Sequence, residues 1–353
     1  MPEQPSIRSL AKKAGVSTAT VSMSLRNHPR IRPEVRARIQ KLASREGYTG
    51  NPLVANLLAQ LRLSRTATYQ STLGMLYFGE IPKYLKDSHT FRDWVAGCEM
   101  RAKSLGYGID HFYLSDLGVP PKRLVKILEA RNIRGLIVFG LFEASVIPKE
   151  FDHLWKHHAA TVIGTHSVRP PLSWVSNDQF STAAYAVEEL FRLGYRRPAL
   201  CINVDIDARV ENRFSGGFHA ALGKWDLSRA IPVFSIDADA RKRFESWVKK
   251  HRPDVILTIH PGIKMWVEAL GMRVPRDIGL VNLDTVLDED GWAGMLQNNQ
   301  SIGSAAVDVV VGQINRNEMG IPPFQKCVLV SSTWTSGKTI RAAAPRKTAG
   351  CKG

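Results

Sequence analysis

Two different hydrophobic patterns follow one another along this chain of 353 residues. In the first sixty residues, apolar positions recur at the three- and four-residue spacing of amphipathic helices. From Leu73 onward, short apolar runs typical of strands alternate with longer helical stretches. The change of pattern predicts a small all-α domain followed by a larger α/β domain.

A tight turn separates the first two predicted helices. The first helical pattern ends at Ala14, and Gly15 permits the left-handed backbone that closes a helix. Ser17 is a natural N-cap for the second helix, in which Val21 and Leu25 share the face that packs on the first. The side chains that this packing directs outward are those of Thr18, Ala19, Ser22 and Met23.

A third helix and a strong positive charge complete this part of the chain. Pro33 indicates the first turn of the helix, and Gly47 indicates its end. Residues 1–65 hold 12 Lys and Arg against 3 acidic residues, which is +9 of the formal net charge of +16. That concentration is typical of a module that contacts phosphates, although a merely basic surface would give the same charge.

Residues 6–22 closely resemble the helix-turn-helix domain of the LacI/GalR (lactose-repressor-like) family of transcriptional regulators. The most specific blocks are Ala-Gly-Val-Ser at 14–17 and Thr-Val-Ser at 20–22. The resemblance implies DNA contacts from Ser6, Ser17, Thr18, Ala19, Ser22, Met23 and Asn27, with base edges read by Thr18, Ala19 and Met23 and phosphates held by the three serines. Met23 replaces the family's usual Arg and cannot make its bidentate contact to guanine, so the operator cannot be transferred from relatives. A helix pair without a nucleic-acid role is the alternative.

Residues 51–58, which follow the third helix, resemble the family's hinge helix. In relatives a leucine of this helix enters the minor groove at the operator centre, and the matching residue is Leu57. An isolated helix this short is marginal in water, so it should form only on DNA. The alternative for residues 51–63 is an ordinary surface helix. We therefore expect a DNA-binding domain at 1–49 and a hinge with its linker at 50–65.

Strand and helix patterns alternate through the rest of the chain. Strands are expected at 73–78, 109–113, 135–139, 161–164, 198–203, 255–259 and 279–284, and helices at 91–105, 122–130, 182–193, 214–223 and 262–270. The alternation predicts doubly wound parallel sheets. The resemblance extends to Arg341 and implies two discontinuous lobes like those of periplasmic binding proteins over 66–341, in a homodimer. Residues 342–353 are expected to be a disordered tail.

The resemblance also implies an effector site in the cleft at the carboxyl ends of the strands, most simply for a sugar. By motif matching, the effector contacts are Phe91, Arg213, His260 and Asp284. An arginine and a carboxylate suit the hydroxyl pairs of a polyol, and an aromatic ring suits the apolar face of a sugar. A structural surface arginine is the alternative for Arg213.

Two departures from the family pattern affect this site. Gly216 and Gly217 stand where the family has one glycine before an aromatic residue, so the register at Arg213 is open by one residue. His260 and Pro261 replace the family's Asn-Asp, and the proline has lost a polar side chain. We therefore expect an effector different from those of the best-known relatives.

Enzyme and membrane functions are not supported. Residues 335–339 imitate the end of a phosphate-binding loop, but Ser332 occupies the place of the required first glycine. His153, His157 and His158 lack a carboxylate or thiol to complete a metal site. No catalytic, metal or cofactor site is predicted. The four scattered cysteines and the absence of a long apolar run indicate a soluble cytoplasmic protein.

The expected function is therefore that of a repressor-type regulator, a homodimer that binds a palindromic site in double-stranded DNA under the control of a sugar. The alternative within the same class is an activator. The alternative of another class is a free sugar-binding or nucleotide-utilising α/β protein with a basic arm. The intact turn at 14–17 favours the regulator, because such a protein would not need it.

Overall fold

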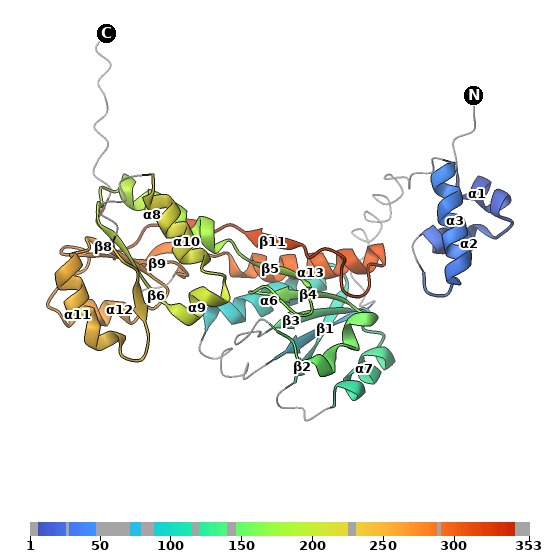
Figure 1. Cartoon of the computed structure of the whole chain (residues 1–353), viewed down its shortest axis with the longest axis horizontal. Coiled ribbons are helices and arrows are strands. Elements are labelled where there is room, and N and C mark those ends of the chain that lie inside the picture. The colour runs from blue at the N-terminus through green and yellow to red at the C-terminus, as the bar shows by residue number, and fades with distance from the viewer. Residues whose placement is uncertain are drawn as a thin grey trace, which may run out of the picture.

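A computed structural model of the chain describes residues 6–25, 28–46, 71–78, 88–114, 120–139, 146–224, 231–287 and 291–342. The predicted contacts Asn27 and Leu57, the hinge and the tail from 343 onward lie outside these residues. The described chain forms three N-terminal helices and, separate from them, two α/β lobes (Figure 1).

The N-terminal helices are α1 (Ile7–Ala14), α2 (Thr18–Leu25) and α3 (Pro33–Arg45). They surround a small core to which Leu10, Val21 and Ile39 each contribute one fully buried side chain. One large apolar residue per helix is what an amphipathic stripe supplies. The predicted helix-turn-helix fold is confirmed.

The turn between α1 and α2 follows from two residues. Gly15 adopts a left-handed conformation with φ of 66°, and its N–H donates to the Ala11 carbonyl. Ser17 Oγ accepts a hydrogen bond of 3.0 Å from the Thr20 N–H, which caps the start of α2. Both features satisfy backbone groups that helix ends leave unpaired.

Each lobe is built on a six-stranded sheet. In the first sheet the order is β11-β5-β4-β3-β1-β2 and every pair is parallel. In the second the order is β12-β10-β9-β8-β6-β7, and only β12 is antiparallel to its neighbour. The strands of the first sheet are β1 (Ser71–Tyr77), β2 (Tyr107–Tyr113), β3 (Gly135–Phe139), β4 (Ala159–Ile163), β5 (Ser173–Asn177) and β11 (Cys327–Val330). Those of the second are β6 (Pro198–Asn203), β7 (Phe234–Ile236), β8 (Val255–Thr258), β9 (Gly279–Asn282), β10 (Ala293–Leu296) and β12 (Thr333–Thr335).

Helices cover both faces of each sheet. The first lobe carries α6 (His89–Ser104) and α13 (Asn299–Arg316) on one face and α7 (Pro121–Ala130) with two short 3-10 turns (Lys149–Phe151 and Leu154–Lys156) on the other. The second carries α8 (Gln179–Arg192) and α10 (Arg213–Leu222) on one face and α11 (Ala240–His251) and α12 (Ile263–Glu268) on the other, with α9 (Val204–Arg209) leading into α10.

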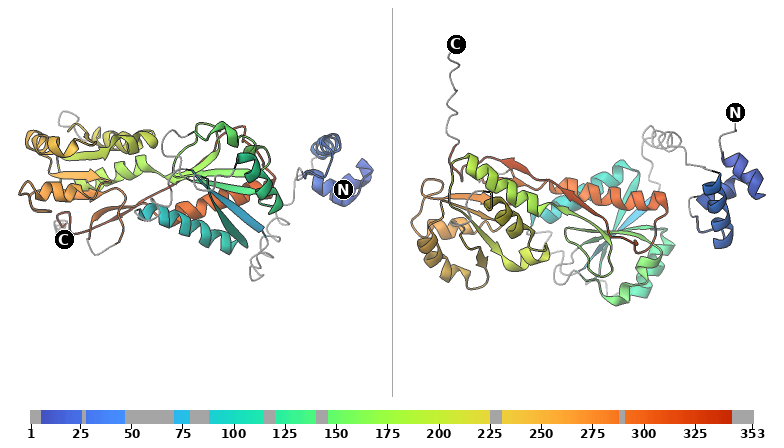
Figure 2. Two further views of the ribbon diagram at one scale, coloured as in Figure 1. Left: turned by 90° about the horizontal axis from the view of Figure 1, so that it is seen from below. Right: turned by 45° about the horizontal axis from the view of Figure 1, so that its top comes forward.

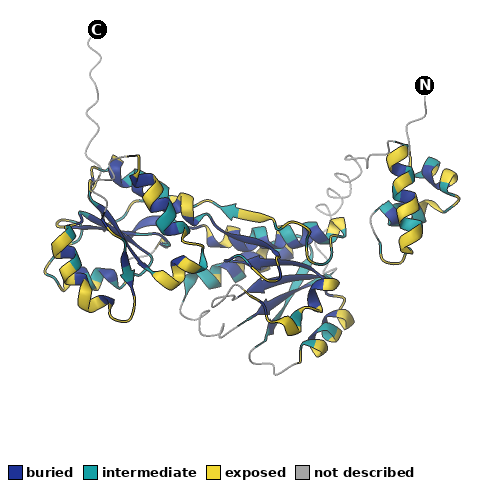
Figure 3. Ribbon diagram, in the orientation of Figure 1, coloured by how far each residue is buried: buried dark blue, intermediate teal, exposed yellow. Residues whose placement is uncertain are grey.

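Alternation along single strands explains this layering. In β6, Leu200 and Ile202 belong to the core under α8 and α10, whereas Ala199 and Cys201 belong to the core under α11 and α12. A strand between two helical layers must be apolar on both sides, as these strands are. The central strands are buried, the edge strands β2, β11 and β12 are partly exposed, and the outward helix faces are exposed (Figure 3). The predicted doubly wound sheets are confirmed.

The chain passes between the lobes three times, after β5, after β10 and after β11. Each sheet therefore receives its last strand from the C-terminal part of the chain. The lobes lie end to end along the long axis (Figure 2). Within the described residues, no helix is long and apolar enough to cross a membrane.

Candidate functional site

The outer face of α2 carries the residues predicted to read DNA. Thr18 and Ala19 are exposed, and Ser22 and Met23 are partly exposed. The opposite face of the helix is closed, because Val21 and Ser24 are fully buried. Met23 thus presents a flexible apolar thioether on this surface, where the family's usual arginine would present a guanidinium group.

Ser6 and Ser17, the two exposed serines predicted to hold phosphates, both cap helices. Ser6 Oγ accepts a hydrogen bond of 3.1 Å from the Ser9 N–H at the start of α1, and Ser17 does the same for α2. A serine hydroxyl that accepts a bond at a cap keeps one proton to donate. Helix N-termini also present N–H groups and a positive dipole end, which suit a phosphate.

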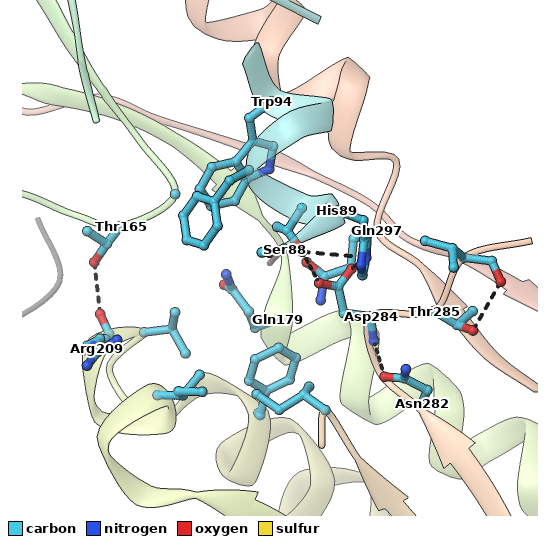
Figure 4. A pocket seen from close by; sticks show the side chains of 18 of the residues that line it. Ser88, His89, Trp94, Thr165, Gln179, Arg209, Asn282, Asp284, Thr285 and Gln297 are labelled. Carbon is cyan, nitrogen blue, oxygen red and sulfur yellow. Dashed lines mark hydrogen bonds and ion pairs between the residues drawn. The ribbon is translucent and has the colours of Figure 1, made fainter. Parts of the chain in front are cut away.

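A cleft of about 630 Å³ lies between the two lobes (Figure 4). It is at the carboxyl ends of the strands, since Ile163 ends β4, Ile259 follows β8 and Asn282 ends β9. Its apolar lining residues are Phe91, Trp94, Ile163, Ile206, Val210, Phe214, Ile259, Pro261, Val286 and Trp292. Its polar ones are Ser88, His89, Thr90, Thr165, Gln179, Arg209, Asn282, Asp284, Thr285 and Gln297.

Asp284 lies in this cleft and links the second lobe to the first. Thr90 donates a 2.6 Å hydrogen bond to Oδ2, and Asn299 donates one of 3.2 Å to Oδ1. His89 Nε2 lies 3.4 Å from Oδ1. The bond to Asp284 raises the pKa of His89, although burial of the ring acts in the opposite direction. We call this group, His89, Thr90, Asn299 and Asp284, the acidic tie.

Phe91, the predicted aromatic contact, also lines the cleft. Its ring meets Trp94 edge to face, with centroids 5.2 Å apart and planes at 80°. Trp94 is held in turn by a 3.0 Å hydrogen bond from Nε1 to Asn299 Oδ1. Asn299 therefore hydrogen-bonds both to Trp94, which contacts Phe91, and to Asp284 of the acidic tie.

The packing of α10 distinguishes the two glycines beside which the register at Arg213 was open. A Cβ on Gly217 would lie 2.0 Å from the Phe180 carbonyl oxygen of α8, whereas a Cβ on Gly216 would meet nothing closer than 3.7 Å. Gly217 is therefore the glycine that the helix contact requires. With this register, Phe214 lines the cleft and Arg213 does not.

Arg213 instead lines a small hollow beside the cleft. Its guanidinium lies over the Trp174 ring at 4.9 Å from the centroid and pairs with Glu211 at 2.8 Å. Trp174 belongs to the first lobe and Arg213 to the second, so this stacking also joins the lobes. The arginine that lines the cleft is Arg209, which the motif did not identify.

A second set of contacts between the lobes lies around Glu211. Its carboxylate is 3.0 Å from His166 Nδ1 of the first lobe, and Thr165 Oγ1 donates a 2.9 Å bond to the Arg209 carbonyl. Glu211 has φ of 58°, a conformation that non-glycine residues seldom adopt. The buried Asp207 holds this turn by accepting from the Phe214 N–H at 3.2 Å. We call Thr165, His166, Trp174, Arg209, Glu211 and Arg213 the basic tie.

His260 is not among the residues that line the cleft, although Pro261 is. The His260 Nδ1 atom accepts a 3.1 Å hydrogen bond from the Gly262 N–H at the start of α12. Its ring also lies 5.7 Å from that of Trp266. The structure thus places two of the four predicted effector residues, Phe91 and Asp284, in the cleft.

Comparison with known proteins agrees with the geometry of both parts. The sequence pattern of the family described as bacterial regulatory proteins, lacI family, matches residues 6–51, which include α1, α2 and α3. Residues 6–51 thus resemble the lacI-family regulatory proteins, and this match does not extend to the two lobes. The NTD biosynthesis operon regulator NtdR of Bacillus subtilis is 22% identical over 80% of this chain and 83% of its own length.

Two solved structures share the fold of this chain. A complex of the transcriptional regulator CelR with cellobiose has a TM-score of 0.58 at 16% identity, covering 95% of this chain and 99% of that one. The lac repressor dimer bound to operator and the anti-inducer ONPF has a TM-score of 0.55 at 18% identity, covering 96% and 99%. The chain is a DNA-binding transcriptional regulator, and its relatives are regulators of transcription, not enzymes.

Several residues that line the cleft were not found by the sequence analysis, namely His89, Arg209, Phe214 and Gln179. Only Gln179 had a usable signal, because it follows a matched Asn-Asp pair at the end of a strand. Among the described residues, no group of three His, Cys, Asp or Glu side chains is arranged to hold a metal ion.

Proposed function

We propose that this protein is a homodimeric repressor that binds a palindromic operator through α2 and is controlled by a sugar bound in the cleft. The observation that carries the proposal is the cleft itself. Residues of both lobes line it, and ion pairs between the lobes lie at its border. A ligand that contacts both lobes changes the stability of the closed arrangement of the lobes relative to the open one. Such a change can alter the spacing of two DNA-binding domains in a dimer.

The proposed effector contacts are Phe91 and Asp284, joined by Arg209. An apolar face of a sugar ring suits Phe91, and its hydroxyl pairs suit a carboxylate and a guanidinium. Binding of cellobiose by the CelR regulator supports the class of ligand. Arg213 and His260 do not line the cleft and are not proposed as direct effector contacts.

The proposed division of the chain is a DNA-binding domain at 1–49, a hinge with its linker at 50–65, an effector and dimerisation domain at 66–341, and a tail at 342–353. The proposed location is the cytoplasm, where the DNA is. Leu57 is the proposed minor-groove wedge.

Operator binding tests the first half of the proposal. The full chain should bind a palindromic site with an affinity that falls steeply as salt rises. A chain that begins at Thr66 should lose this binding. If that shorter chain kept the affinity of the full chain, the assignment of DNA binding to residues 1–65 would be wrong.

Ligand-induced stabilisation tests the second half. A sugar that binds only the folded protein must raise its melting temperature. We expect this rise to be lost in Asp284→Asn and reduced in Phe91→Ala, with operator binding retained in both. If the sugar raised the melting temperature of both variants as much as that of the wild type, the proposed site would be refuted. Whether the sugar weakens or strengthens operator binding decides if it acts as an inducer or a corepressor.

A further inference from the structure

Five buried side-chain polar atoms of the described residues have no hydrogen-bond partner: Ser24 Oγ, Trp155 Nε1, Gln179 Oε1, Trp247 Nε1 and Gln313 Oε1. Only one of these residues, Gln179, lines the cleft. A buried acceptor without a donor costs free energy, and folded proteins contain few of them. For an unpaired acceptor in a binding cleft, a bound ligand can supply the missing donor.

The orientation of the Gln179 amide follows from its neighbour. Ser176 Oγ donates its only proton to the Gly164 carbonyl at 2.9 Å, so it can only accept from other groups. Gln179 Nε2, which lies 2.9 Å from Ser176 Oγ, must therefore be the donor of that contact. A flipped amide would place two acceptors against each other, so Oε1 is the atom that points away from Ser176.

The place of Gln179 in the fold suits contact with a ligand. It is the first residue of α8, directly after the chain has left β5 and passed to the second lobe. Its side chain lies in the middle of the cleft, between Trp94 of the first lobe and Arg209 of the second (Figure 4). The residue is 5% exposed, so its side chain is largely withdrawn from bulk solvent.

Asp284 differs from Gln179 in this respect. Its carboxylate already receives hydrogen bonds from Thr90 and Asn299 and lies beside His89. An effector reaches Asp284 by joining or replacing these groups, whereas Gln179 Oε1 has no protein donor to lose.

We propose that Gln179 determines effector specificity by accepting a hydrogen bond from a hydroxyl group of the sugar. This rests on the proposed function, in which the cleft binds a sugar. The requirement is for a donor at one ring position, so a sugar that lacks this hydroxyl is rejected while the rest of the cleft still fits. Rejection by an unpaired buried group is a strong form of discrimination.

The test uses the full chain and a defined set of probes: D-ribose, D-glucose, D-galactose, maltose and cellobiose. Binding is measured by calorimetry for the wild type, Gln179→Leu and Gln179→Met, which keep the volume and remove the acceptor. Gln313→Leu is the matched control, because Gln313 in α13 has the same unpaired buried oxygen away from the cleft lining. We expect roughly tenfold weaker binding of the active sugar in both Gln179 variants and none of this loss in the control.

Monodeoxy derivatives of the active sugar identify the hydroxyl group. One derivative should bind the wild type roughly tenfold more weakly than its parent, yet bind the Gln179 variants as well as the parent does, which is the coupling expected of two groups in contact. Equal sugar affinity in wild type and a folded Gln179 variant would overturn the inference. A wild type that binds none of the five sugars would instead refute the sugar effector of the proposed function, and the inference with it.

Discussion

The two adjacent glycines of α10 offer a sharp test of the cleft geometry. Gly216 and Gly217 are both inside the helix, but only Gly217 contacts the backbone of α8. We predict that Gly216→Ala stabilises the protein and that Gly217→Ala destabilises it. The two variants make the same chemical change one residue apart, so each is the control for the other.

The magnitudes follow from propensity and packing. Alanine is favoured over glycine inside a helix by about 0.8–1.0 kcal/mol, which is the gain expected for Gly216→Ala. At Gly217 the new Cβ would lie 2.0 Å from the Phe180 carbonyl oxygen, and real contacts essentially never fall below 3.0 Å. Because that oxygen belongs to a helix backbone, α8 must move. Overpacking of this kind costs about 3 kcal/mol, so the net loss is about 2 kcal/mol.

The assay is urea unfolding of the full chain with each variant. The midpoints should separate by the equivalent of about 3 kcal/mol at an unchanged slope, or roughly 6–12 °C in melting temperature. Gly217→Ala should also weaken sugar binding, since its neighbour on α8, Phe180, follows Gln179. If Gly217→Ala were as stable as Gly216→Ala, α8 and α10 would not pack in this register, and the placement of Phe214 in the cleft would be wrong.

Three further predictions concern the caps and the ties. Ser17→Ala should destabilise the N-terminal domain by about 1 kcal/mol and weaken operator binding, as measured by thermal unfolding and DNA titration. His89→Gln should lower the melting temperature most below about pH 6.5. Asp284 raises the pKa of His89, and the stabilisation that comes from a raised pKa is lost as the pH rises through that pKa, so the difference from the wild type should shrink as pH rises. A difference that grows with pH would contradict the acidic tie. Glu211→Gln should open the lobes and increase the radius of gyration in X-ray scattering, and an unchanged radius would argue against the basic tie.

Much of the fold was predictable because most strands and helices have long, regular apolar patterns. The expected strands at 135–139 and 198–203 match β3 and β6 at both ends. Helix α13 was not predicted, because its core positions include small residues such as Gly303 and Ala306 while its Val309–Val311 run looks like a strand. Strands β5, β7 and β10–β12 were not predicted either, and β7 and β12 have only three residues each, too few for a clear pattern.

The candidate site was predictable only where a residue's position in the chain determines its direction. Asp284 is the last residue of a predicted strand and Phe91 is the first of a predicted helix, and both line the cleft. The direction of Arg213 depends on which glycine packs against α8, which cannot be decided from spacing. Arg209 lines the cleft because two lobes meet there, and contacts between distant segments leave no local signal.

The three passages between the lobes have a consequence for the order in which the protein is made. The helical N-terminal core is complete at residue 46, but the first lobe needs α13 and β11 and the second needs β12, which ends at Thr335. Neither lobe can close its sheet until almost the whole chain has left the ribosome. A prematurely terminated product would therefore carry a finished DNA-binding domain without a working sensor, a species that could occupy an operator and answer to no ligand.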